Sequence, residues 1–279
     1  MRLPDFLIAG SQKAGTSWLS LMLSQHPDVY IPRDEIHFFN KAHHFAKGAL
    51  WYKQQFIGAD NACRIGEKTP NYMWVNAPGG ETDLPDMHVR IRALLPDVKL
   101  IFILRDPVER AISAFNHHVR HGRIAPYWRI DDVLCHDEYE DLRRRFGIIS
   151  MGMYHTQIAE FLKLYDGSQV LVLIFEEDVR ERPQHGLRKV CDFLDIEPNF
   201  PFEYPSEAIN RQRKSIVSMY CNYFAPPLIR ITKRIDRFLP GAPSLYPSDE
   251  TRNRLADIYR GENEKLFGLL GFEPAAWHR

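Results

Sequence analysis

A glycine-containing loop between an apolar run and a helical pattern is the most chemically informative part of the sequence. The apolar run leads to Gly10, and Lys13 and Gly15 follow before apolar residues recur at helical spacing. A strand–loop–helix of this kind presents backbone N–H groups and the positive end of a helix to an anion. Aligning G-x-x-x-x-G-K-[ST] with residues 10–17 puts Thr16 where nucleotide-binding loops carry lysine. The loop is therefore predicted to bind phosphate without the usual ATP–magnesium arrangement.

A second candidate anion site follows the apolar run Leu-Ile-Phe-Ile-Leu. Arg105 comes directly after this run, and Asp106, Pro107 and Glu109 match the N-cap, N1 and N3 positions of a capped helix. Ser113 would lie two turns into that helix. Arginine suits phosphate because its guanidinium can donate two parallel hydrogen bonds. Two other interpretations exist: Arg105 could pair only with a surface carboxylate, and Asp106 could be the magnesium ligand of an ATPase, although capping explains Asp106 without a metal.

The elements that must position these residues alternate between strands and helices. Two of the apolar runs are continuous, as in strands that are buried on both faces of a parallel sheet. Alternating strands and helices predict a doubly wound α/β domain, which binds ligands beyond the carboxyl ends of its strands. The predicted strands are 6–9, 63–66, 100–104 and 170–175, and the predicted helices are 17–25, 87–95, 108–121, 154–165, 183–194 and 249–270.

Composition leaves the choice of function to local features. The chain has 279 residues, of which 44% are hydrophobic and 26% charged, and its 36 Lys and Arg balance its 36 Asp and Glu. This profile is typical of a globular protein, and nothing in it calls for a nucleic acid or an anionic membrane as partner. The sequence contains no secretory signal and no predicted membrane span, and four widely spaced cysteines form no C-x-x-C pair. A cytoplasmic protein with reduced thiols is the expectation.

The two loops together resemble the co-substrate site of sulfotransferases. Their 5′-phosphosulfate loop, K-x-G-T-[ST]-x-L, is matched by Lys13, Ala14, Gly15, Thr16, Ser17, Trp18 and Leu19. Their 3′-phosphate segment is matched by R-D-P-x-E-R-x-x-S at residues 105–113. The resemblance implies a P-loop-like sulfotransferase fold that binds 3′-phosphoadenosine 5′-phosphosulfate (PAPS) and releases 3′,5′-ADP. It also implies that Arg105 and Ser113 hold the 3′-phosphate.

A third set of motifs resembles the heparan-sulfate N- and 3-O-sulfotransferases in particular. The residues are E-I-H-F-F at 35–39, G-x-x-W-Y at 48–52 and E-K-T-x-x-Y at 67–72. The resemblance implies that Glu35 is the catalytic base and that Lys68 lines the site. From the residues alone Glu35 would be an ordinary loop carboxylate, and His37 is a rival base, because other sulfotransferases use histidine.

The reaction explains why such groups are needed. Sulfuryl transfer requires a base within hydrogen-bond reach of the acceptor proton, and it develops negative charge on the leaving phosphate oxygen. Lys13 is our choice for stabilising that charge, with Lys68 as a second cation and no metal required. Trp18 could stack on adenine, although an aromatic residue there is often simply core. Arg213 and Lys214 match only loosely the basic loop that such enzymes close over the nucleotide, and Tyr154 matches a recurrent family tyrosine without a derivable role.

These observations predict one sulfotransferase domain over residues 1–279, with about 199–279 forming a helical and loop cover. The expected acceptor is a small molecule or a glycan that is sulfated on a hydroxyl or amine. The alternatives are an ATP-dependent P-loop kinase and a non-catalytic nucleotide- or glycan-binding domain. Neither the identity of the acceptor nor the oligomeric state is readable from the sequence.

Overall fold

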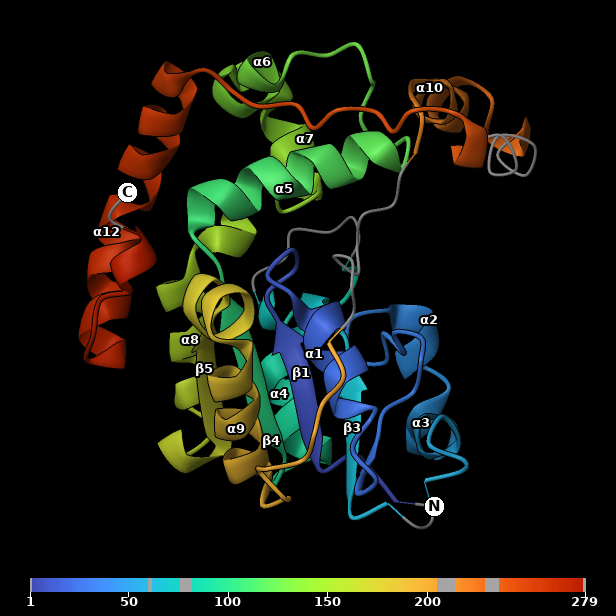
Figure 1. Ribbon diagram of the computed structural model, residues 1–279, viewed down its shortest axis with the longest axis vertical. Helices are drawn as coiled ribbons and strands as arrows, with labels where there is room; N and C mark the ends of the chain where they lie inside the picture. The colour runs from blue at the N-terminus through green and yellow to red at the C-terminus, as the bar shows by residue number, and fades with distance from the viewer. Residues whose placement is uncertain (1, 60–61, 76–81, 205–213, 229–235, 278–279) are drawn as a thin grey trace.

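The core of the protein is a parallel sheet whose strand order differs from the order in sequence. In a computed structural model, which describes residues 2–59, 62–75, 82–204, 214–228 and 236–277, the order is β2-β3-β1-β4-β5 (Figure 1). Each neighbouring pair is parallel. The strands are β1 (Phe6–Gly10), β2 (Val29–Tyr30), β3 (Arg64–Lys68), β4 (Lys99–Leu104) and β5 (Val170–Ile174). The carboxyl ends of β1, β3 and β4 therefore meet at one edge, where ligands bind in such folds.

Both faces of the sheet are covered, as the continuous apolar runs require. Successive side chains of a strand point to opposite faces. Phe6 and Ile8 join one buried cluster with residues of α1 (Thr16–Leu23) and α9 (Pro183–Leu194). The residues that alternate with them join a second cluster with α4 (Met87–Leu94) and α8 (Tyr154–Leu162). The result is the three-layered, doubly wound arrangement that the sequence predicts.

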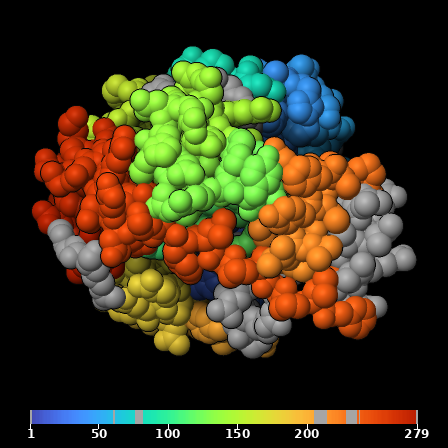
Figure 2. Space-filling view, turned by 90° about the horizontal axis from the view of Figure 1, so that it is seen from above, coloured from blue at the N-terminus to red at the C-terminus, as the bar shows by residue number. Residues whose placement is uncertain are grey.

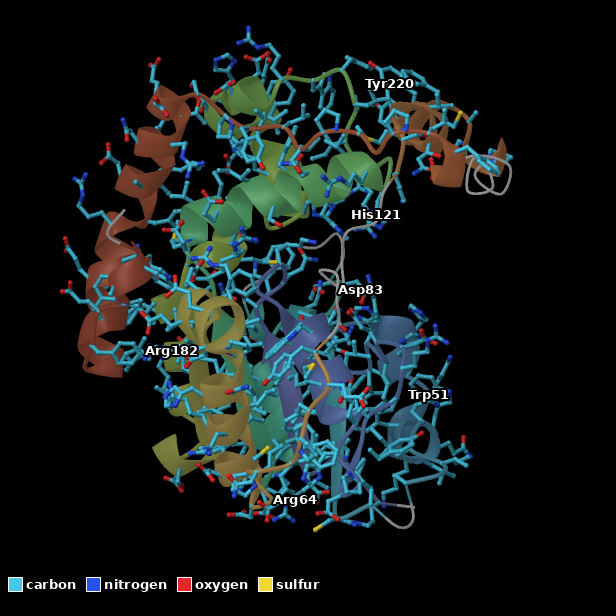
Figure 3. The ribbon with its side chains drawn as sticks, in the orientation of Figure 1. Trp51, Arg64, Asp83, His121, Arg182 and Tyr220 are labelled. Atoms are coloured by element: carbon cyan, nitrogen blue, oxygen red, sulfur yellow. The ribbon has the colours of Figure 1, made fainter. Side chains whose placement is uncertain are left out.

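A cover of helices lies over the carboxyl edge of the sheet. α5 (Pro107–Arg120) crosses above the strands, and α12 (Asp249–Leu270) packs along α8 and α5 (Figure 1). Seen from above, the green segment after α5 and the orange-to-red C-terminal segments spread over this end of the molecule (Figure 2). Figure 3 places His121 beside this edge and Arg64 at the opposite end of the sheet. The remaining helices are α2 (Ala42–Phe45), α3 (Gly48–Gln54), α6 (Ile130–Cys135), α7 (Glu140–Arg145) and α10 (Ile216–Phe224), with 3₁₀ turns η1 (Pro70–Met73), η2 (Asp137–Tyr139), η3 (Ser150–Gly152), η4 (Gly167–Gln169), η6 (Pro226–Leu228), η7 (Asp236–Phe238) and η8 (Ala275–Trp277), and a π-helical turn, η5 (Phe175–Glu181).

The predicted fold class is confirmed, with corrections at the level of single elements. The two-residue strand β2 escaped prediction because it is too short to show a hydrophobic period. Phe175 begins the π-helical turn instead of ending β5, and Lys68 is the last residue of β3 instead of following it. α12 ends where predicted, before Gly271, whose left-handed φ of 75° is the usual end of a helix. None of the described helices combines the length and the apolar character that crossing a bilayer requires.

Candidate active site

The first anion loop has the predicted strand–loop–helix form. Gly10 ends β1 so close to η1 that a Cβ there would lie 2.4 Å from the Cβ of Met73. Gly15, with φ 93°, is the N-cap of α1, and a Cβ on it would lie 3.0 Å from the Phe175 ring. Within the described residues of this turn, α1 begins with neither a capping side chain nor an acidic residue. Its first N–H groups therefore lack helical acceptors and suit an anion.

Lys13 extends this loop into a cluster of cations. Its Nζ lies 3.5 Å from Nδ1 of His117 on α5. Burial, together with the nearby positive charges of Arg120, Arg105 and Arg110, lowers the pKa of Lys13 to about 8. These three neighbouring charges repel the charged form of Lys13, and a bound anion would offset that repulsion. The donor set at this edge therefore fits a phosphosulfate group.

The second anion loop is confirmed as a capped helix start. The Asp106 carboxylate accepts a hydrogen bond from the backbone N–H of Glu109 at 2.9 Å, which explains Asp106 without a metal. Arg105 donates to the backbone oxygen of Lys13 at 3.3 Å and lies over the Phe175 ring. Glu109 is 3.6 Å from the Arg105 guanidinium and also pairs with Arg252. The buried Nε of Arg105 has no hydrogen-bond partner among the described residues, so this arginine retains donor capacity for an anion.

Tyr154 connects the two anion loops. Its hydroxyl donates to the backbone oxygen of Arg105 at 2.9 Å and accepts from the Arg105 N–H at 3.4 Å. The Ser11 hydroxyl, in the first loop, donates to it at 3.5 Å. Burial raises the pKa of Tyr154 to about 12, so the phenol keeps the proton that this bridge uses. The structure thus gives this tyrosine a bracing role that its sequence position did not reveal.

Glu35 lies across the site from Lys13 and between two basic side chains. Its Oε1 is 2.8 Å from Nζ of Lys68, and its Oε2 is 3.3 Å from Nε2 of His37. Burial raises the pKa of Glu35, but the hydrogen bond from His37 and the charge of Lys68 outweigh burial and hold this pKa below its ordinary value. Glu35 is therefore ionised at neutral pH and able to accept a proton.

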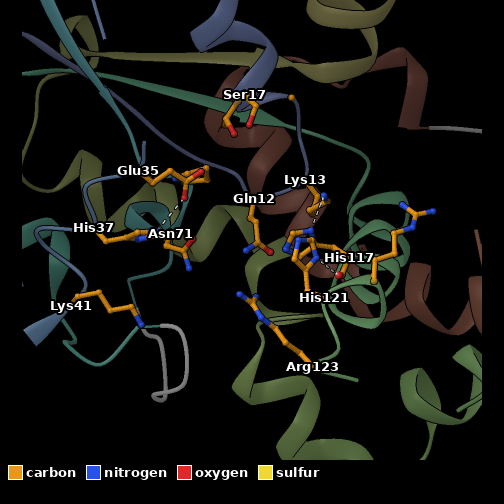
Figure 4. A pocket seen from close by; sticks show the side chains of 14 residues that line it. Gln12, Lys13, Ser17, Glu35, His37, Lys41, Asn71, His117, His121 and Arg123 are labelled. Carbon is orange, nitrogen blue, oxygen red and sulfur yellow. Dashed lines mark hydrogen bonds and ion pairs between the residues drawn. The ribbon is translucent and has the colours of Figure 1, made fainter. Parts of the chain in front are cut away.

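One cavity of about 330 Å³ joins Lys13 of the first loop to Glu35 and His37 (Figure 4). Figure 4 shows Lys13, His117 and His121 on one side, Glu35, His37 and Lys41 on the other, and Gln12 between them. The cavity is lined by Gln12, Lys13, Gly15, Thr16, Ser17, Glu35, His37, Lys41, Pro70, Asn71, His117, Arg120, His121 and Arg123. The residues of α5 that follow Ser113 were not identified from the sequence as part of the cavity lining. The signal was present, since Ser113, His117 and His121 are spaced by four residues and share one helix face.

Several predicted residues lie beside this cavity and not among its described lining residues. They are Lys68, Arg105, Ser113, the fully buried Ala14, and Trp18, which packs against the cluster of α1 and α9. Lys214 donates from Nζ to the backbone oxygen of Arg120 at 3.1 Å, which brings it to the end of α5. Arg213 lies outside the described residues.

The histidines near the cavity are poorly disposed to carry charge. Burial lowers the pKa of His117 to about 2 and that of His118 to about 3, and the charge of Lys13 contributes to both shifts. Neutral imidazoles can accept as well as donate hydrogen bonds. Among the described residues, no three His, Cys, Asp or Glu side chains are grouped so as to hold a metal ion.

Comparison with known proteins agrees with this geometry. A profile described as "Sulfotransferase domain" matches residues 3–221. The human bifunctional heparan sulfate N-deacetylase/N-sulfotransferase 2 is 32% identical over 100% of this chain and 31% of its own length. The mouse heparan sulfate glucosamine 3-O-sulfotransferase 3B1 is 30% identical over 70% of this chain and 47% of its own. The chain thus spans less than half the length of these curated relatives.

The fold is shared with a solved bacterial protein. The crystal structure of a sulfotransferase from Alicyclobacillus acidocaldarius superposes with a TM-score of 0.74 at 24% identity, covering 100% of both chains. At this identity the likeness establishes the fold alone. Because the domain profile covers most of the sequence, including both anion loops and Glu35, the chain belongs to the sulfotransferase domain family.

Proposed function

We propose that this protein transfers a sulfuryl group from PAPS to a hydroxyl or amine of a saccharide or other small acceptor. The observation that carries the proposal is the shared cavity, in which an ionised Glu35 held by Lys68 faces the cationic loop around Lys13. A passive binding domain has no need of such a paired base, and a P-loop kinase would carry a lysine where this phosphate loop has Thr16. Relatives with heparan sulfate in their names support a saccharide as the acceptor class.

Each of these residues has a separate role in a direct in-line transfer. Lys13 and the first N–H groups of α1 would hold the 5′-phosphosulfate, and Arg105 with Ser113 the 3′-phosphate. Glu35 would take the acceptor proton as the new bond from the acceptor oxygen or nitrogen to sulfur forms. The bond between sulfur and the bridging phosphate oxygen breaks, and Lys13 stabilises the charge that 3′,5′-ADP carries away. Lys68 holds Glu35 in place and adds positive charge beside the transferring group.

The proposed 3′-phosphate site predicts a ligand-specific effect of one substitution. Arg105→Ala should weaken the binding of 3′,5′-ADP by about 10–100-fold, because hydrogen bonds to charged groups contribute about 1.5–3 kcal/mol each. Binding of 5′-AMP, which lacks the 3′-phosphate, should change little in the same variant. Calorimetry without magnesium on the wild type and on Arg105→Ala and Arg105→Lys checks this. Equal losses for the two nucleotides would contradict a 3′-phosphate role for Arg105.

The absence of a metal requirement is tested by chelation. We expect sulfuryl transfer from PAPS to continue in excess chelator, since the loop cations and N–H groups supply the positive charge. An ATP-dependent kinase would lose its magnesium and stop. The assay compares labelled product formed from PAPS with and without chelator, and a non-catalytic domain would give none in either case.

A further inference from the structure

Strand β3 carries two adjacent charged residues with very different surroundings. Successive side chains of a strand point to opposite faces. The Lys68 side chain contacts Glu35, which lines the cavity, at 2.8 Å. Glu67 points the other way and is only 1% exposed. Burying a carboxylate in such a place costs free energy unless several hydrogen-bond donors satisfy it.

Three hydroxyl groups converge on the Glu67 carboxylate. The Oε1 atom accepts from the Tyr72 hydroxyl at 2.6 Å and from the Thr69 hydroxyl at 2.8 Å. The Oε2 atom accepts from the Tyr52 hydroxyl. Both tyrosines are fully buried. Burial raises the pKa of Glu67, while the three hydroxyl donors oppose that rise.

Two of these hydroxyls also hold the backbone of the segment that follows Glu35. The Tyr72 oxygen accepts from the N–H groups of Phe38 at 2.9 Å and Phe39 at 3.4 Å. The Thr69 oxygen accepts from the N–H of His37 at 3.4 Å. A hydroxyl has a single proton to donate. Because the Tyr72 and Thr69 hydroxyls each donate their proton to Glu67, the lone pairs of both hydroxyl oxygens face the N–H groups of residues 37–39.

The segment of residues 37–39 begins with an unfavourable backbone conformation. His37 has φ 54°, a left-handed conformation that costs free energy for a residue with a side chain. Its imidazole contacts Glu35 and is braced in turn by Asn40, whose Oδ1 lies 3.2 Å from Nδ1. A small shift of residues 37–39 would therefore move Glu35 away from Lys68.

We propose that Glu67 is a positioning residue for sulfuryl transfer, which fixes the Glu35 carboxylate against Lys68 by orienting the hydroxyls of Tyr72 and Thr69 toward the backbone of residues 37–39. The inference rests on the proposed function. Glu67 touches no substrate in this scheme. It acts on Glu35 through the hydroxyl groups of Tyr72 and Thr69. It acts on Lys68 as its neighbour on β3.

Tyr52 and Tyr72 offer a matched pair of variants. Each loses one buried hydroxyl bond to Glu67 when replaced by phenylalanine, and each keeps its ring. Only the Tyr72 hydroxyl also holds the N–H groups of Phe38 and Phe39. Tyr72→Phe should lower kcat about 10–100-fold, since displacement of a catalytic group by about 1 Å can cost about 10²-fold. Tyr52→Phe should lower kcat less than about threefold.

Two further readouts separate positioning from general stability. Affinity for 3′,5′-ADP should change less than about twofold in both variants, because the phosphate loops lie on β1 and β4. In Tyr72→Phe the acidic limb of the kcat/KM profile should move to higher pH, because Glu35 loses part of its contact with Lys68 and His37. The melting temperature should fall further in Tyr72→Phe than in Tyr52→Phe, because Tyr72→Phe also leaves the N–H groups of Phe38 and Phe39 without their acceptor.

Thr69 provides a second test in case Tyr72→Phe does not fold. Thr69→Val removes the hydroxyl with little change in shape, and Thr69→Ser restores it. We expect kcat to fall in the valine variant and to recover in the serine variant. Equal losses of kcat in Tyr52→Phe and Tyr72→Phe, or an unmoved pH profile, would overturn the positioning role while leaving the proposed function intact. A wild-type protein without sulfuryl transfer would overturn both.

Discussion

Glu35→Gln should lower kcat for sulfuryl transfer about 10²–10⁴-fold, the usual contribution of a positioned general base. Glutamine preserves the shape of the side chain and one acceptor oxygen, but it cannot take the acceptor proton. The Lys68 contact at 2.8 Å would weaken to a hydrogen bond between a cation and a neutral group. Affinity for 3′,5′-ADP should stay within a few-fold of the wild type, because the amide introduces no charge at the phosphate loops. Steady-state kinetics together with calorimetry on the same variant check both expectations.

The pH profile distinguishes Glu35 from His37 as the base. A base must be unprotonated, so kcat/KM falls as pH drops through its pKa in the free protein. The pKa of Glu35 is held below its ordinary value, which puts this acidic limb below about pH 4.5. A histidine base of ordinary pKa would place the limb near pH 6.5. His37→Gln should therefore retain most of the activity, and a limb near pH 6.5 that disappears in this variant would assign the proton transfer to His37 instead.

The sequence predicted those parts of the site that lie within short, continuous motifs. The glycines around Lys13 and the capped helix start at Asp106 are local features, because loop geometry and helix capping are fixed within a few residues. The sheet could be predicted for the same reason, since β1 and β4 are apolar runs whose two faces are both buried. These segments carry their structural signal in their own composition.

The contacts between motifs could not be predicted from the residues alone. Glu67, Thr69 and Tyr72 form one motif, but their bonds to residues 37–39 span more than thirty positions of sequence. Nothing in the pattern shows that Tyr154 bridges Ser11 and Arg105. Such bonds depend on the packing of the completed fold, and side-chain hydrogen bonds leave no periodic trace in a sequence. The positioning of Glu35 is thus a tertiary property, whereas its identity as a candidate came from the motif.

Substitution of Lys13 is the second change with a large expected effect on activity. The lowered pKa of Lys13 also makes the binding of the nucleotide depend on pH in a distinctive way. Lys13→Met should lower kcat/KM about 10³-fold, because it removes a fixed cation both from the bound phosphosulfate and from the developing charge on the leaving oxygen. Lys13→Arg retains a charge in a different shape and should recover only part of the loss. Initial rates with PAPS at subsaturating concentration measure both variants.

The same residue predicts how nucleotide binding responds to alkaline pH. Lys13 has a pKa of about 8 in the free protein, and a bound phosphate favours its charged form. Between about pH 7 and pH 8 the lysine is mostly protonated, so affinity for 3′,5′-ADP should change little there. Above pH 8 binding must take up a proton, and the affinity should fall by up to about tenfold per pH unit. The phosphates of the ligand are fully ionised above about pH 7 and add no titration in this range.

Calorimetry at pH 7 and pH 9, in buffers of different ionisation enthalpy, measures that proton directly. The wild type should take up close to one proton at pH 9 and much less at pH 7. Lys13→Met should bind weakly with no uptake at pH 9, and Lys13→Arg should bind without the alkaline loss, because arginine stays protonated throughout. An affinity that is flat to pH 9.5 in the wild type, or uptake that persists in Lys13→Met, would remove Lys13 from the phosphate site. The lowered pKa of Lys13 would then reflect only its burial and the nearby charges of Arg120, Arg105 and Arg110.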